Sequence, residues 1–169
     1  MAVTLIVEDG SNVPNANSYA DVATLRAYAD SRGLDLPDGD DELAQMCIVA
    51  MDYIEAMEYR MKGCRTYDDQ SLSWPRKGVC INGSRFPDNA IPKSLINALC
   101  QLTVDATALD GNLTPTQTEY AIRQEVIGPM STTYAVNTVN GSGAFVPQYT
   151  KFDQFMRPLL NAAGGSTYR

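Results

Sequence analysis

The chain has 169 residues, a formal net charge of −7 and no histidine. The absence of histidine removes the commonest general base, the usual partner of a catalytic serine or cysteine, and most zinc sites. The acidic balance opposes tight binding to a phosphate backbone, because each phosphate contact needs a cation.

Residues 1–16 predict an extended N-terminal segment. Its apolar start has no basic region and soon reaches Glu8 and Asp9, so we expect no signal peptide. No apolar run approaches the length of a bilayer span, and we expect no membrane partner. A first helix is predicted to begin at Ser18 as N-cap, with Asp21 completing a capping box, and to end at Gly33.

Two longer helices are predicted to complete a helical core over residues 17–111. Asp40 or Asp41 can cap the second helix, and Gly63 can end it. Pro92 suits the first turn of the third helix, which is expected to stop before Gly111. The second helix has the clearest apolar period in the chain, at Leu43, Met46, Cys47, Ala50, Tyr53, Ile54 and Met57.

The core is interrupted by a polar insertion at residues 63–91, which holds the chain's single tryptophan. Long loops in small domains commonly contact a partner. Asn82-Gly83 predicts a β-hairpin turn within it. Aromatic and basic side chains occur together here and could hold single-stranded nucleic acid, namely Trp74, Arg76, Lys77, Arg85 and Phe86. The other interpretation, which the acidity favours, is that Trp74 and Pro75 anchor the loop while the cations meet acids of this or a neighbouring subunit.

After the core, residues 112–140 predict an extended or strand segment, and residues 141–169 a tethered C-terminal arm. The arm carries a helix-spaced apolar cluster formed by Phe152, Phe155, Met156, Leu159 and Leu160. This cluster can fold back onto the chain's own core or dock on a neighbouring subunit.

The residues offer little for catalysis. The four cysteines lack any Cys-x-x-Cys spacing, and Asp40-Asp41 and Asp68-Asp69 are typical of caps and turns. No phosphate-binding or nucleophile motif is present. We therefore expect no enzyme, no catalytic residue, no metal and no cofactor.

Seven short motifs follow one another along nearly the whole chain: Pro14-Asn-Ala-Asn-Ser-Tyr19, Ala50-Met-Asp-Tyr-Ile54, Lys62-Gly-Cys-Arg-Thr66, Gln70-Ser-Leu-Ser-Trp-Pro-Arg76, Ile91-Pro92, Val126-Ile-Gly-Pro129 and Arg157-Pro-Leu-Leu160. In this order they resemble the head-to-tail connector, or adaptor, proteins of tailed bacteriophages, some of which are labelled DnaT-like single-stranded-DNA-binding proteins. Each is weak alone.

The resemblance implies a virion protein of the neck, assembled in the host cytoplasm. Its subunits would form a ring, expected to be a dodecamer, beneath the portal protein and above a downstream neck or tail protein. DNA would pass through the lumen without specific binding. The apolar arm residues would dock on the portal, and the Asn82-Gly83 hairpin would project toward a neighbour or the lumen.

We thus expect a mainly α fold: a small helical bundle with a long loop and β-hairpin insertion, and an extended C-terminal arm ending in a short helix. The expected function is that of a head-to-tail adaptor. The alternative is a single-stranded-DNA-binding module that uses the Trp74, Arg76 and Lys77 loop.

Overall fold

A computed structural model describes residues 3–113, 124–127, 130–133 and 149–161 of the chain. The chain divides into two compact units. One unit is Met1–Leu113 with Tyr149–Arg169, and the other is Thr114–Gln148. The first unit holds the helices, and within it the N-terminal and C-terminal parts of the sequence share one core.

Helix α1 spans Val22–Asp30 and begins later than the sequence predicts. Its N-cap is Asp21, whose carboxylate accepts a hydrogen bond from the Thr24 backbone N–H at 2.8 Å. Ser18 is fully buried instead, and its hydroxyl donates to the Ala20 carbonyl at 2.7 Å. The predicted cap was therefore wrong because Ser18 bonds to a turn that precedes the helix.

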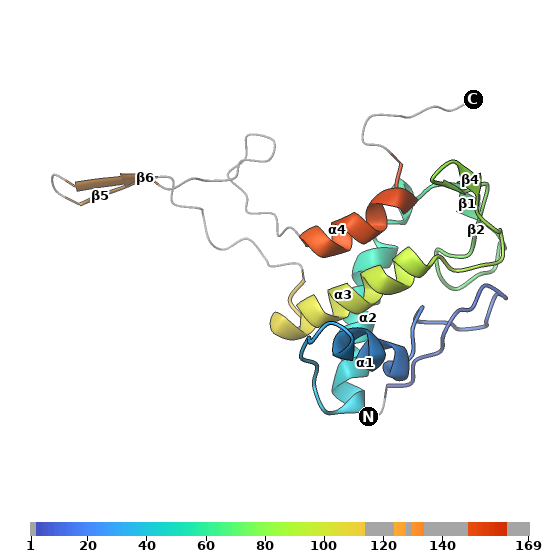
Figure 1. The fold of residues 1–169 in the computed structure, drawn as a ribbon, viewed down its shortest axis with the longest axis horizontal. Helices are drawn as coiled ribbons and strands as arrows, with labels where there is room; N and C mark the ends of the chain where they lie inside the picture. Colours follow the sequence, from blue (N-terminus) through green and yellow to red (C-terminus); the bar gives the residue numbers. More distant parts are fainter. Residues whose placement is uncertain (1–2, 114–123, 128–129, 134–148, 162–169) are drawn as a thin grey trace. The chain divides into compact units, whose positions relative to one another are not determined.

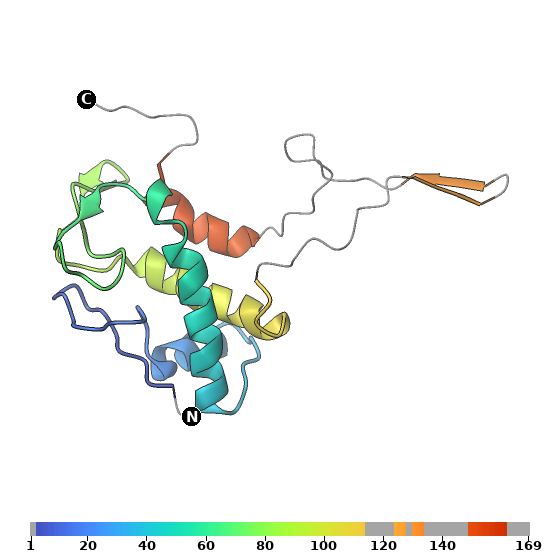
Figure 2. The same cartoon turned by 180° about the vertical axis from the view of Figure 1, so that it is seen from behind.

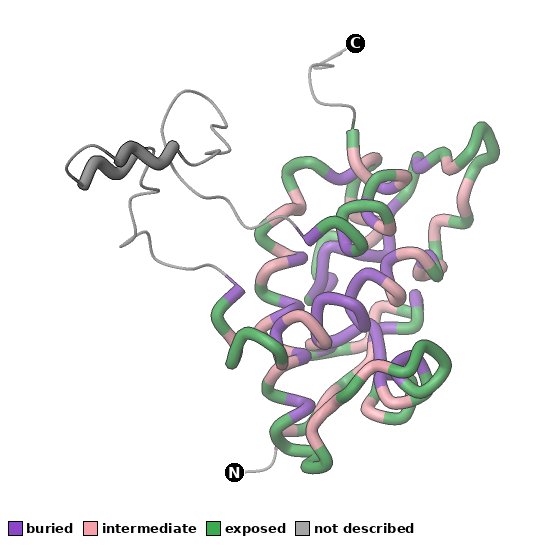
Figure 3. The backbone as a smooth tube through the Cα atoms, turned by 60° about the vertical axis from the view of Figure 1, so that its left-hand side comes forward, coloured by how far each residue is buried: buried purple, intermediate pink, exposed green. Residues whose placement is uncertain are grey.

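Helices α2 (Asp40–Glu55), α3 (Lys93–Ala108) and α4 (Thr150–Met156) pack together, and 3₁₀ turns η1 (Glu58–Arg60) and η2 (Arg157–Leu159) follow α2 and α4 (Figures 1 and 2). The N-cap of α2 is Gly39, without a side-chain hydrogen bond, so neither predicted aspartate caps it. Buried positions gather where these helices meet (Figure 3). The fully buried apolar side chains include Leu43, Ile54, Leu95, Leu99, Leu102, Phe152, Met156 and Leu159.

The insertion contains two antiparallel strand pairs. Strand β1 (Cys64–Arg65) pairs with β2 (Arg76–Lys77), and β3 (Cys80–Ile81) pairs with β4 (Ser84–Arg85). Asn82 and Gly83 join β3 to β4 with φ of 51° and 81°, as a two-residue hairpin turn requires. The predicted hairpin is confirmed.

The second unit contains strand β5 (Gln124–Ile127), which pairs with β6 (Met130–Thr133) in antiparallel register from Gln124 opposite Thr133 to Ile127 opposite Met130. Residues 134–148, where the predicted extended segment meets the predicted C-terminal arm, lie outside the described residues.

The expectation of a mainly α bundle was wrong. The described residues combine four α-helices with six short strands in three two-stranded antiparallel sheets, so the fold mixes α and β elements. The β1–β2 pair was not expected at all, because strands of two residues leave no alternating apolar pattern in the sequence. Among the described residues, every helix is too short or too polar to cross a bilayer.

Candidate functional site

Trp74 is the central residue of the insertion and is fully buried. Its ring meets Phe86 edge to face, with centroids 6.1 Å apart. Pro75, joined to it by a cis peptide bond, is also buried, while Asn82 and Gly83 at the hairpin turn are exposed. The indole therefore holds the insertion against the core and presents no face to solvent.

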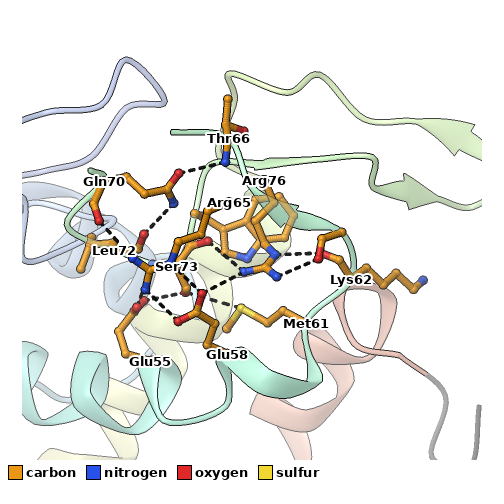
Figure 4. Close-up of polar contacts among 12 residues, drawn as sticks. Glu55, Glu58, Met61, Lys62, Arg65, Thr66, Gln70, Leu72, Ser73 and Arg76 are labelled. Atoms are coloured by element: carbon orange, nitrogen blue, oxygen red, sulfur yellow. Dashed lines mark hydrogen bonds and ion pairs between the residues drawn. The ribbon is translucent and has the colours of Figure 1, made fainter. Parts of the chain in front are cut away.

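Arg76 follows Trp74 and is enclosed as well, with its side chain 7 % exposed. Its guanidinium donates to the backbone carbonyls of Lys62 at 2.8 Å and Gly63 at 2.9 Å (Figure 4). It also contacts the Glu58 carboxylate at 3.4 Å. One side chain thus ties β2 to the chain segment that leaves η1, with donors in the fixed planar arrangement that only arginine supplies.

The Glu58 carboxylate pairs with a second arginine, Arg65, at a shorter distance than with Arg76. Arg65 donates to both of its carboxylate oxygens, at 2.7 and 2.8 Å. The Arg65 hydrogen bond is the main cause that lowers the pKa of Glu58, and the positive charges of both arginines add to it. The same pairing raises the pKa of Arg65. Because Glu58 and Arg65 are each about one-third exposed, this bidentate pair fixes geometry more than it adds stability.

A second carboxylate, Glu55 at the end of α2, organises the buried side of the insertion. It accepts the Tyr19 hydroxyl at 2.7 Å, the Ser73 hydroxyl at 2.9 Å and the Ser73 backbone N–H at 2.8 Å. The Tyr19 oxygen in turn accepts the Trp74 backbone N–H at 3.1 Å. Burial, with the nearby Glu55 charge, raises the pKa of Tyr19 well above its ordinary value. The network joins the N-terminal segment, α2 and the insertion.

Sequence reasoning did not identify Tyr19, Glu55 or Glu58 as part of this site. In the sequence, both glutamates look like exposed positions of the predicted second helix, since neither interrupts its apolar period. The available signal was the pairing of two acids at the end of that helix with Arg65 and Arg76 in the following insertion.

The two aspartate pairs have structural partners. Asp40 forms an ion pair with Arg26 at 2.6 Å, and Asp69 accepts the Asn12 amide at 2.9 Å. Within the described part of the chain, no three His, Cys, Asp or Glu side chains gather closely enough to hold a metal ion.

The model of the family described as "Putative DnaT-like ssDNA binding protein" matches residues 3–169. The chain belongs to this family. No curated protein and no solved structure matches it. The family description names single-stranded-DNA binding and does not name a phage connector.

The residues predicted to bind single-stranded DNA are not displayed together. Trp74 and Arg76 are enclosed, and Phe86 is half-buried against the Trp74 ring. Lys77 and Arg85 are exposed, and Arg85 forms an ion pair with Asp88 at 2.8 Å. Stacking needs an accessible aromatic face. In this fold the loop offers two surface cations without the tryptophan that was expected to accompany them.

The apolar residues of the predicted docking arm lie in or beside the chain's own core. Phe152, Met156 and Leu159 are fully buried, while Phe155 and Leu160 are half-buried. Phe152 meets Tyr53 edge to face, with centroids 5.6 Å apart.

Backbone hydrogen bonds hold the same segment. The Lys62 N–H donates to the Leu159 carbonyl at 2.9 Å, and the Asn161 N–H donates to the Arg60 carbonyl at 2.8 Å. Portal docking through this cluster stays a prediction, and it would require α4 to exchange these internal contacts for external ones.

Proposed function

We propose that the protein is a structural subunit of a phage head-to-tail adaptor. It forms a ring beneath the portal, extends the DNA channel and joins the capsid to the tail. The proposal draws on the succession of motifs that resembles the connector group, and on the way in which the insertion is built.

The observation that carries the proposal is the internal fixation of the insertion. Its aromatic and basic motif faces inward, where Trp74 fills the core and Arg76 binds backbone carbonyls and Glu58. The β3–β4 hairpin remains at the surface on this fixed base. A pre-ordered projection suits contact with another protein, because little conformational entropy is lost when it binds.

The charge balance supports the same role. A channel subunit must let DNA slide, and a net charge of −7 disfavours a lasting hold on phosphates.

Electron microscopy of the full chain mixed with portal particles tests the proposal. We expect a ring bound to the portal and co-sedimentation of the two proteins. A chain that forms no ring and fails to co-sediment with portal would refute the adaptor role.

Single-stranded-DNA binding is a second candidate, because the family match covers almost the whole chain and its description names that activity. This description supports DNA binding more directly than it supports the adaptor role. The exposed cations of the insertion, Lys77 and Arg85, are the side chains that this fold offers for phosphate contacts.

Fluorescence anisotropy of a labelled oligonucleotide tests this candidate. Two phosphate contacts give a logarithmic salt slope of about −1.4 for a single strand. Lys77→Glu combined with Arg85→Glu should then abolish binding, whereas Lys151→Glu on α4 combined with Arg157→Glu on η2, both at exposed positions, serves as a charge-matched control. Anisotropy that stays flat with the wild-type chain at low salt would exclude the candidate.

A further inference from the structure

The charges of the chain are unevenly distributed between the two ends of α2. Residues 30–42 include the loop from α1 and the first turn of α2, and they contain six Asp or Glu residues and one Arg. All six acids are exposed. We call this surface the acidic end, and its members are Asp30, Asp35, Asp38, Asp40, Asp41 and Glu42.

Helix chemistry explains only part of the acidic end. Carboxylates in the first turn of α2 interact favourably with the helix dipole, which accounts for Asp40, Asp41 and Glu42. Asp35 and Asp38 precede the helix, and Asp30 ends α1, where a negative charge opposes the dipole. The ion pair from Arg26 to Asp40 offsets one charge. The acidic end therefore carries more negative charge than favourable interactions with the helix dipoles account for.

Positive charge is concentrated beyond the C-terminal end of α2. Residues 58–93 hold seven of the thirteen Lys and Arg residues of the chain but four of its twenty Asp and Glu residues. This local excess of cations stands out in a chain of net charge −7. We call this surface the basic end, and its exposed cations are Arg60, Lys77, Arg85 and Lys93.

The two ends are too far apart to neutralise each other. Helix α2 separates them, and its 16 residues correspond to a length of about 24 Å. The views in Figures 1 and 2 agree that the loop before α2 and the β1–β4 insertion lie at opposite ends of the helical unit. Since the Debye length is about 10 Å at 0.1 M salt, each end is free to attract a partner of opposite charge.

We propose that the acidic end of one subunit binds the basic end of the next copy of the same chain. This inference rests on the ring proposed above. A contact between two different faces of identical subunits is heterologous, and it closes into a ring when the rotation between neighbours allows. Complementary potentials fix the direction in which subunits join and speed their encounter.

A charge exchange tests the contact with two variants of the full chain. The acid-reversed variant carries Asp35→Lys and Asp38→Lys, both in the exposed loop before α2. The base-reversed variant carries Lys77→Glu and Lys93→Glu, both exposed. Arg85 is left in place because it pairs with Asp88. Sedimentation velocity of each variant, and of their equimolar mixture, is compared with the wild-type chain at low and high salt.

We expect wild-type self-association that weakens about tenfold or more between 50 and 500 mM salt, as exposed charge pairs are screened. Each variant alone should associate more weakly than wild type, because the acid-reversed variant brings the formal charge of residues 30–42 from −5 to −1, and the base-reversed variant brings that of residues 58–93 from +3 to −1. The mixture should recover association, since the unaltered basic end of the acid-reversed variant and the unaltered acidic end of the base-reversed variant still carry opposite charges. Circular dichroism of each variant verifies that its fold is retained.

Three results would overturn the inference: wild-type association insensitive to salt, variants that associate as strongly as wild type, or a mixture that gains nothing over its components. Oligonucleotide binding that is lost in the base-reversed variant, together with a wild-type chain that never self-associates, would instead assign the basic end to nucleic acid. Co-sedimentation of the base-reversed variant with portal particles separates failure of the charge contact from failure of the adaptor role. If the variant still binds portal, the adaptor role stands and only the proposed contact between subunits is wrong.

Discussion

Replacement of Phe152 by alanine tests whether the C-terminal segment is part of the core. The ring is fully buried and packs edge to face on Tyr53 at 5.6 Å. Removal of a buried phenylalanine costs about 3–5 kcal/mol through lost transfer free energy and the cavity left behind. The free energy of unfolding of a domain of this size is about 5–15 kcal/mol, so Phe152→Ala should remove a large part of it.

The assay is urea unfolding followed by far-ultraviolet circular dichroism, with the midpoint and slope fitted for each variant. Phe155→Ala is the matched control on the same helix, because Phe155 is only half-buried and its loss should cost less. A variant Phe152→Ala whose free energy of unfolding lies within about 1 kcal/mol of wild type would refute the packing of α4. Such a result would favour an arm held away from the core.

Three further outcomes follow from the insertion and the buried thiols. Tyr19→Phe should lower the free energy of unfolding by about 1–3 kcal/mol in the same urea assay, because the Glu55 carboxylate and a backbone N–H lose a buried partner; an unchanged midpoint would contradict the network. Pairing lowers the pKa of Glu58 below its ordinary value of 4.5, so its stabilising contribution is present above that pH and is lost as the pH falls through the lower folded value. Stability measured from pH 6 to pH 3 should consequently fall less steeply in Glu58→Gln than in wild type, and parallel profiles would argue against the ion pairs. A thiol reagent should label two cysteines in the native chain and four after unfolding, since burial raises the pKa of Cys100 to about 12 and also that of Cys47; mass spectrometry should locate the native labels on the exposed pair, Cys64 and Cys80.

The long helices could be predicted from the sequence because their apolar periods are local. The stripe from Leu43 to Met57 indicated a helix, and the structure has α2 at Asp40–Glu55. Pro92 was expected in the first turn of the next helix and serves as the N-cap of α3. The Asn82-Gly83 turn could also be predicted, since both turn positions require positive φ and Asn followed by Gly is one of the few residue pairs that adopt it.

The fold class and the interior of the insertion could not be predicted in this way. Two-residue strands such as β1 and β2 are defined by partner residues 11 and 13 positions away and leave no periodic signal. The roles of Glu55 and Glu58 likewise depend on contacts with residues 7 to 36 positions away in the chain. A charged residue that closes such a contact looks, in sequence, like any exposed position on the polar side of a helix.

The Tyr149 hydroxyl donates to the Leu113 carbonyl at 2.7 Å, so the residues on either side of the segment 114–148 are hydrogen-bonded neighbours. A short linker could therefore join position 113 to position 149 without displacing α3 or α4. Conversely, a reporter domain whose own termini lie close together could be inserted at this junction at little cost to the helical unit. The junction thus offers a practical attachment point for a fluorescent label by which assembly could be followed.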